Sequence, residues 1–135
     1  MKKEDNQAFQ ESESYKKYRE ALLSLLGKEV EVKVDRPLGS AHPKFKQMIY
    51  PVNYGYVESL LAPDGDYQDA YILGVNQPLD SYVGEVIAIV ERSDDVEGKL
   101  IVAPKGKRYL KQEIEEAIYF QERYFKHTLL MAKQN

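Results

Sequence analysis

The chain has 135 residues, enough for one domain, residues 1–135, that buries about two thirds of its unfolded surface without disulfide bonds. It contains no cysteine, which excludes disulfides, thiolate nucleophiles and sulfur-ligated zinc. Its net charge of −3 argues against nonspecific binding to nucleic acid, and no segment approaches the ~18 apolar residues of a membrane span. We therefore expect a soluble, cytoplasmic enzyme or binding protein.

The chain begins with a polar segment followed by a predicted helix. We expect residues 1–10 to be disordered, because polar termini without apolar anchors fray. A helix is predicted over residues 12–26, with Gly27 as its C-terminal stop. Its apolar residues recur at spacings of three and four: Tyr15, Tyr18, Leu22, Leu25 and Leu26. This narrow stripe is typical of a packing or oligomer helix without chemistry of its own.

Strands are predicted through the middle of the chain. In residues 29–36, valines alternate with charged residues, which is the period of a half-buried strand. Pro37 ends this strand and begins a loop, and residues 48–50 resume an extended segment. Three further strands are predicted over residues 70–75, 85–91 and 100–103. Residues 86–90 are continuously apolar, which indicates a strand buried on both faces.

A second helix is predicted near the C-terminal end, from Lys111 to about Leu130. The residues of its stripe are Ile114, Ala117, Ile118, Gln121, Phe125 and Leu129. Short strands separated by turns, with one helix at each end, favour a mainly β fold of the α+β class. We expect a small closed barrel that carries the two helices on its outside.

An acidic segment interrupts the predicted strands. Asp64, Asp66 and Asp69 fall within six positions, Asp-Gly-Asp-Tyr-Gln-Asp. Carboxylates this close repel one another, and a bound hard cation is the usual compensation. A calcium loop of the EF-hand type is excluded, because its sixth and twelfth places hold Asp69 and Val75 in place of Gly and Glu. The acids by themselves leave two interpretations open, a metal site and a plain Asp-Gly turn.

Two further motifs flank this acidic segment in sequence. Residues 50–56 read Tyr-Pro-Val-Asn-Tyr-Gly-Tyr, and residues 94–104 form an acidic loop followed by Lys99 and an apolar strand ending in Pro104. With these motifs, the chain resembles the soluble family I inorganic pyrophosphatases over about residues 30 to 126, as a short and divergent member. The resemblance implies a five-stranded OB-like barrel with an active site at one mouth, and assembly into a homo-oligomer.

The resemblance also implies roles for individual residues. Asp64 and Asp69 would be metal ligands, Asp66 the general base next to the attacking water, and Tyr54 a supporting hydroxyl. Two positions match phosphate-binding residues of the family, Lys99 and Tyr124. The implied cofactor is Mg²⁺, which prefers oxygen ligands and lowers the pKa of a bound water.

The acidic loop departs from the family pattern. The family has two spaced aspartates there that bind metal; Glu97 takes the second place, and Arg92 aligns near the first. Asp94 and Asp95 are displaced, and we take Asp94 and Glu97 as the metal ligands of this loop. An arginine beside the metals would repel a cation unless it binds phosphate or points outward. The family's earlier N-terminal strand, with its glutamate and lysine, is replaced by the helix over residues 12–26.

The residues that would bind phosphate are altered as well. Phe125 stands where the family has a lysine, and Lys126 comes one residue later, about 100 degrees around a helix. Arg36 is the candidate for the family's phosphate-clamping arginine, because a planar guanidinium suits bidentate contacts to oxygen. The loop after it is long, so His42 or Lys44 are alternatives. Arg36 in a surface pair with a neighbouring acid is the plainer interpretation.

The leading hypothesis for function is metal-dependent hydrolysis of inorganic pyrophosphate to two phosphates by a Mg²⁺-activated water. The alternative is a divergent relative that hydrolyses, or only binds, another small phosphate compound. A third class, an OB-like module for single-stranded nucleic acid, would need a basic, aromatic groove, and the acidic net charge argues against it. The expected partner is thus a small molecule, with neither nucleic acid nor membrane.

Overall fold

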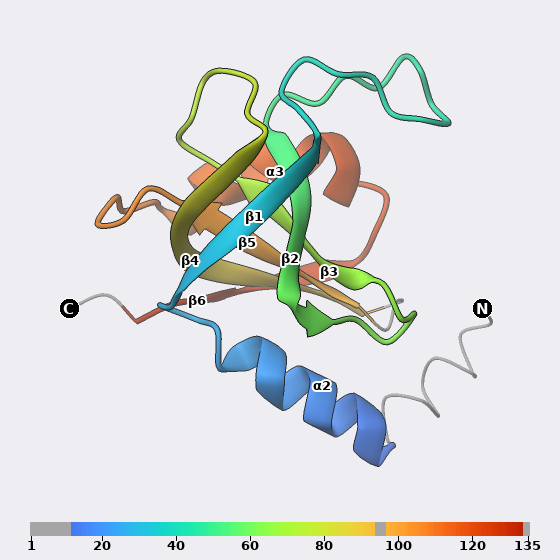
Figure 1. The fold of residues 1–135 in the computed structure, drawn as a ribbon, viewed down its shortest axis with the longest axis vertical. Helices are drawn as coiled ribbons and strands as arrows, with labels where there is room; N and C mark the ends of the chain where they lie inside the picture. Colours follow the sequence, from blue (N-terminus) through green and yellow to red (C-terminus); the bar gives the residue numbers. More distant parts are fainter. Residues whose placement is uncertain (1–11, 94–96, 134–135) are drawn as a thin grey trace.

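The computed structural model of the chain describes residues 12–93 and 97–133. Two helices and six strands follow one another in Figure 1: α2 (Glu13–Leu23), β1 (Glu29–Arg36), β2 (Asn53–Leu61), β3 (Tyr67–Ile72), β4 (Ser81–Arg92), β5 (Gly98–Ala103), α3 (Lys111–Glu122) and β6 (His127–Met131). Within the part of the chain that is described, no helix is long and apolar enough to cross a membrane.

The strands form a closed barrel. Their order is β1-β2-β3-β5-β4-β6, and β1 also pairs with β4, which closes the first five into a ring. Strands β3 and β5 run parallel, and the other neighbours run antiparallel. With β6 added along β4 and one helix before and one after the barrel strands, the predicted five-stranded OB-like barrel is confirmed (Figure 1).

The hydrophobic core consists of two clusters on the two sides of the curved sheet. Tyr18 and Leu22 of α2 pack into one cluster, and Ile114 and Ile118 of α3 pack into the other. Every residue of β5 is buried, and β4 is buried continuously from Val86 to Val90, as its apolar run predicts. The stripe of α2 therefore packs within the chain, which is one of the two roles that the sequence left open for it.

The prediction of one helix from Lys111 to about Leu130 is wrong. Helix α3 ends at Glu122, and residues 127–131 form β6, which pairs with β4 from Ala88↔Met131 to Arg92↔His127. The cause is the length of β4: β1 covers only its residues 81–85, so the second half of β4 needs another partner for its backbone groups. Ladder hydrogen bonds and burial of Leu129 outweigh a helical spacing that is purely local.

Of the other predicted elements, the first helix is shorter than expected and the first strand has the expected bounds. Helix α2 ends at Leu23, before the predicted Leu26, and the chain reverses at Gly27, whose φ of +80° suits glycine. The N–H of Gly27 donates to the carbonyl of Val86 at 2.8 Å, which ties the end of the helix segment to β4. Strand β1 covers the predicted residues 29–36, and its valines alternate inward as expected.

Candidate active site

Three adjacent strands bring a carboxylate, an ammonium and a phenol together. Asp69 lies on β3, between Tyr54 on β2 and Lys99 on β5. One carboxylate oxygen of Asp69, Oδ2, accepts hydrogen bonds from Lys99 Nζ at 2.7 Å and from the Tyr54 hydroxyl at 2.9 Å. The Lys99 side chain is 6% exposed and that of Asp69 is 34% exposed, so the group opens toward solvent at the carboxylate.

The protonation states of this group follow from its surroundings. Burial lowers the pKa of the Lys99 ammonium, but the nearby Tyr54 and Asp69 raise it by more, so the net pKa lies above the ordinary lysine value and Lys99 is charged. Burial raises the pKa of Tyr54, so its hydroxyl keeps its proton and donates a hydrogen bond to Asp69. The strands thus present a fixed positive charge beside a partly exposed carboxylate.

A second acidic contact joins two loops to this group. Glu97, directly before β5, lies 3.5 Å from Lys99 Nζ through Oε2. Glu97 also hydrogen-bonds Asp64 of the β2–β3 turn, and this bond lowers the pKa of Asp64. A hydrogen bond between two carboxyl groups needs a shared proton, because two bare carboxylates repel each other. Asp64, Glu97, Lys99, Asp69 and Tyr54 therefore form one continuous chain of contacts, called here the acid–lysine chain.

The β2–β3 turn has the features of a plain Asp-Gly turn as well. The φ of Gly65 is +90°, and the N–H of Asp66 donates to Asp64 Oδ1 at 3.0 Å. The Asp66 side chain is exposed on this turn. The Asp64 carboxyl thus takes part both in the turn, through the N–H of Asp66, and in the contact with Glu97.

Arg36 at the end of β1 is directed toward the aromatic residues of the site. Its Nη1 donates to the Tyr50 hydroxyl at 2.6 Å, and its guanidinium carbon lies 5.7 Å from the ring centroids of both Tyr50 and Tyr54. His42 instead accepts the backbone N–H groups of Lys44 and Phe45 within its own loop. Of the three candidates for the phosphate clamp, Arg36 is the one for which the described residues show a contact to the acid–lysine chain, at the Tyr54 ring.

Two of the remaining predicted residues are exposed and make contacts of their own. The Tyr124 side chain is exposed and its hydroxyl accepts a hydrogen bond from Arg123 Nη2 at 2.6 Å. Lys126 is exposed, and its backbone carbonyl accepts the N–H of Ser93 at 2.9 Å. Asp94, like residues 1–10, lies outside the described residues.

A buried ion pair that was not predicted from the sequence joins β4 to α3. Arg92 at the end of β4 donates from Nε and Nη2 to Glu122 of α3 at 2.9 and 2.7 Å, and Tyr71 donates to the same carboxylate. The Arg92 guanidinium also lies 3.7 Å from the centroid of the Phe125 ring. Glu122 thus compensates the charge of Arg92. One signal was present: Glu122 follows Ile114 and Ile118 at a spacing of four, a charged residue on an apolar stripe.

The donor set fits a hard divalent cation in its chemistry. Asp64, Glu97 and Asp69 offer carboxylate oxygens, the ligands that Mg²⁺ prefers. In residues 12–93 and 97–133, no group of three or more acidic or histidine side chains is already arranged around one point as metal ligands. A cation bound between Asp64 and Glu97 would take the place of the proton in their hydrogen bond.

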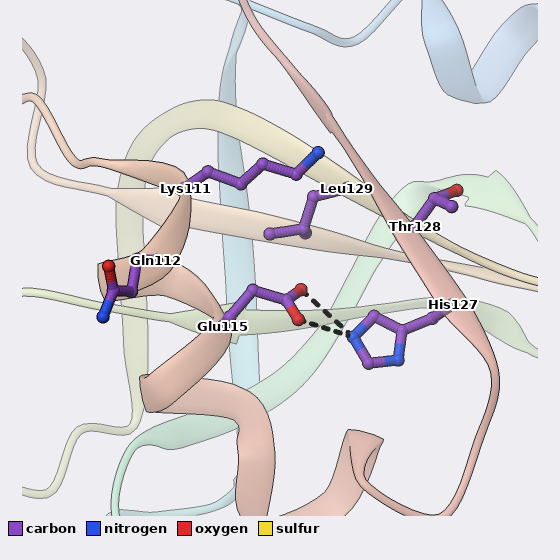
Figure 2. A pocket seen from close by; sticks show the side chains of 6 residues that line it. All are labelled: Lys111, Gln112, Glu115, His127, Thr128 and Leu129. Carbon is purple, nitrogen blue, oxygen red and sulfur yellow. Dashed lines mark hydrogen bonds and ion pairs between the residues drawn. The ribbon is translucent and has the colours of Figure 1, made fainter.

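A hollow of about 500 Å³ lies elsewhere, between α3 and β6 (Figure 2). Glu115 and His127 meet across it, with His127 Nε2 3.1 Å from a Glu115 carboxylate oxygen, and Lys111 flanks them. None of the predicted site residues lines this hollow. Residues of the last helix and the last strand line it, and none of them belongs to the acid–lysine chain.

The fold defines the class of this chain: a small closed OB-like barrel with an acidic and lysine-containing site on its strands. The family model of inorganic pyrophosphatases matches residues 12–129. The chain therefore belongs to the inorganic pyrophosphatase family, as its motifs predict, and the predicted hydrolysis of pyrophosphate is the activity that this family assignment supports. No curated protein matches the chain significantly.

Solved structures of bacterial inorganic pyrophosphatases have a similar fold. The enzyme from Ehrlichia chaffeensis aligns with a TM-score of 0.59 at 15% identity, over 79% of this chain and 88% of that one. The enzyme from Coxiella burnetii aligns at 0.56 and 20% identity, over 76% and 84%. The enzyme from Neisseria gonorrhoeae aligns at 0.54 and 20% identity, over 76% and 75%. At identities this low, the structural alignments show a likeness of fold alone.

Proposed function

We propose that this chain is a Mg²⁺-dependent inorganic pyrophosphatase whose reaction takes place at the acid–lysine chain. The observation that supports this most is the direct contact of Lys99 with Asp69 and Glu97, which sets a charged ammonium among carboxylates from separate segments. Asp64, Asp69 and Glu97 would hold the ion, with Asp94 as a further ligand. Mg²⁺, when bound there, would supply Lewis acidity and an activated water.

The side chains have distinct tasks in this proposal. Lys99 and Arg36 bind phosphate oxygens and neutralise charge that develops on the leaving phosphate, with Tyr124 and Lys126 at the outer edge of the site. Tyr54 keeps its proton and fixes Asp69 through their hydrogen bond. Asp66, which projects from the β2–β3 turn, takes the proton of the attacking water as general base.

The proposal also covers the location, assembly and partners of the enzyme. It includes a cytoplasmic location, a homo-oligomer, and a small-molecule substrate with neither nucleic acid nor membrane as partner. A second candidate, a relative that only binds or hydrolyses another small phosphate compound, is favoured by one observation. Arg92 aligns near a metal-binding aspartate of the family pattern, and its charge is compensated in the interior by Glu122.

The test is phosphate release from pyrophosphate by the purified chain. We expect turnover with Mg²⁺, loss of turnover with a chelator, and recovery when Mg²⁺ is restored. ATP, another phosphoanhydride, serves as the competing substrate in a parallel reaction. Hydrolysis of ATP alone would move the assignment to the second candidate, and binding of pyrophosphate without hydrolysis in calorimetry would leave a binding protein.

Replacing Arg36 by Lys tests the phosphate clamp. The variant keeps the positive charge but loses the planar guanidinium that donates to Tyr50 and lies over two rings. We expect KM for pyrophosphate to rise by about tenfold, which corresponds to about 1.4 kcal/mol, with a smaller change in kcat. The matched control is Arg108→Lys, the same change at an exposed arginine between β5 and α3. An unchanged KM for Arg36→Lys would remove Arg36 from the substrate site.

A further inference from the structure

Tyr18 of helix α2 contacts strands β3 and β5, the two strands that carry Asp69 and Lys99. The Tyr18 hydroxyl donates to Gln68 Oε1 at 2.6 Å and accepts the backbone N–H of Gly98 at 3.0 Å. Tyr18 is 8% exposed, so both bonds lie in the interior. Gln68 directly precedes Asp69, and Gly98 directly precedes Lys99. One hydroxyl thus touches the neighbours of both members of the Asp69–Lys99 pair.

Gln68 completes this link between the two strands. Its side-chain amide donates to the carbonyl of Gly98 at 2.7 Å and to the carbonyl of Asp69 at 3.0 Å. Gln68 is fully buried, and its amide group is satisfied on both its oxygen and its nitrogen. Tyr18 and Gln68 together bind both backbone polar groups of Gly98. We call Tyr18, Gln68 and Gly98 the tyrosine clasp.

The tyrosine clasp connects β3 and β5 at a point that their ladder of paired residues does not reach. The parallel pairing of β3 with β5 begins at Ala70↔Leu100, one residue beyond Asp69 and Lys99. At Asp69 and Lys99 themselves, the spacing of the two strands is therefore set by the clasp on one side and by that first pair on the other. Because Asp69 and Lys99 must meet at 2.7 Å, a small change in strand spacing would separate their charged groups.

Packing and an ion pair also connect helix α2 to the barrel strands next to the clasp. A Cβ at Gly98 would lie 2.7 Å from Leu22 Cδ2, so α2 rests directly on the glycine backbone. Arg19, next to Tyr18, donates from Nε and Nη2 to the two carboxylate oxygens of Glu91 on β4, at 2.8 and 3.0 Å. The absence of a side chain at Gly98 is what permits the close approach of α2 to the segment that carries Glu97 and Lys99.

We propose that Tyr18 is a positioning residue of the active site, which acts through Gln68 and Gly98 to align Asp69, Lys99 and Glu97. This rests on the proposed function. The clasp determines the backbone position of two strands, and the charged groups that it aligns are those proposed to hold Mg²⁺ and phosphate. Groups that orient metal ligands through a hydrogen bond typically contribute about 10- to 100-fold to metal affinity or activity.

Tyr18→Phe tests this directly, because it keeps the buried ring and removes only the hydroxyl. We expect Mg²⁺ affinity, measured by calorimetry without substrate, to fall by about tenfold, and kcat to fall by about tenfold with KM within about twofold. Amide exchange at Gly98, followed by NMR, should accelerate because its N–H loses its acceptor. Tyr15→Phe, the same change on the same helix outside the clasp, should leave Mg²⁺ affinity and kcat unchanged.

Arg19→Gln separates positioning from a general loosening of the helix. It removes the ion pair to Glu91 and keeps the Tyr18 hydroxyl and both of its hydrogen-bond partners. If Arg19→Gln lowers kcat and Mg²⁺ affinity as much as Tyr18→Phe does, the hydroxyl has no special role and the proposal is overturned. The proposal is also overturned if Tyr18→Phe retains the kcat and the Mg²⁺ affinity of the unmodified chain. Should Tyr18→Phe fail to fold, Gln68→Asn, which shortens the other half of the clasp, applies the same criteria.

The outcome for the clasp is distinguishable from that for the enzyme activity. If the unmodified chain releases no phosphate from pyrophosphate, the proposed function fails. In that case Mg²⁺ affinity and Gly98 exchange still decide whether Tyr18 aligns the acidic group. If the unmodified chain is active and Tyr18→Phe equals it in kcat and in Mg²⁺ affinity, only the clasp proposal fails.

Discussion

Replacing Asp69 by Asn is expected to lower kcat for pyrophosphate hydrolysis by about 100-fold or more, at the upper end of what altered metal-site contacts cost. Asp69 Oδ2 accepts from both Lys99 and Tyr54, so one substitution disturbs three residues of the acid–lysine chain. Asn keeps the size of the side chain but removes the negative charge that Mg²⁺ and Lys99 require. The measurement is steady-state phosphate release, with the melting temperature recorded in parallel.

Asp80→Asn is the matched control for that variant. Asp80 is exposed in the loop between β3 and β4, and the substitution makes the same chemical change away from the acid–lysine chain. It should leave kcat within about twofold, since surface substitutions rarely change more than about 0.5 kcal/mol. Full activity of Asp69→Asn in an assay where the unmodified chain turns over would place the reaction elsewhere on the barrel.

Glu122→Gln should lower the free energy of unfolding by about 3–5 kcal/mol, the usual effect of breaking a buried ion pair from one side. Glu122 is fully buried, and its carboxylate is the acceptor for Arg92 and Tyr71. The amide keeps the shape but removes the negative charge that the Arg92 guanidinium, 6% exposed, contacts at 2.7 Å. Chemical denaturation of the two proteins at neutral pH measures the difference.

The same pair predicts how stability depends on pH. Burial raises the pKa of Glu122, but its hydrogen bonds with Arg92 and the charge of that guanidinium lower it by more, so the folded pKa lies below the ordinary value of 4.5. A depressed folded pKa stabilises the protein above the unfolded pKa, and this contribution is lost as the pH falls through the folded value. The difference in unfolding free energy between the unmodified chain and Glu122→Gln should therefore shrink below about pH 4.5.

The control for Glu122→Gln lies on the same helix. Glu116 is exposed on α3, and Glu116→Gln should change the unfolding free energy by less than about 0.5 kcal/mol. Equal effects of Glu116→Gln and Glu122→Gln would mean that helix charge, and not the buried pair, accounts for the loss. A difference in unfolding free energy that stays constant from pH 6 to pH 3 would contradict the pKa argument.

Local patterns predicted those parts of the fold whose causes are local. The alternating valines of β1 and the apolar run of β4 report burial within one strand, so the sequence was sufficient to predict both. At the C-terminal end the same reasoning was wrong. Phe125 and Leu129 have helical spacing, but β6 forms because β4 lacks a partner, and that need arises only once the barrel is closed.

For the site, motifs identified residues and tertiary structure decided their contacts. Tyr54, Asp69 and Lys99 were singled out by the sequence, and the strand order β2-β3-β5 brings them into direct contact. The partners Arg92 with Glu122 and Tyr18 with Gln68 are 30 and 50 residues apart. Short-range periodicity carries no information about such pairs.

The sequence by itself determined the family, the barrel class and the acidic residues offered for a metal, because these depend on residue type and order. Only the folded chain decided that Glu122 neutralises Arg92 and that a helix hydroxyl reaches the strands behind Asp69 and Lys99. The physical reason is that buried polar groups must find partners wherever the closed barrel brings them. Those partners are set by strand pairing and packing over long separations in the chain.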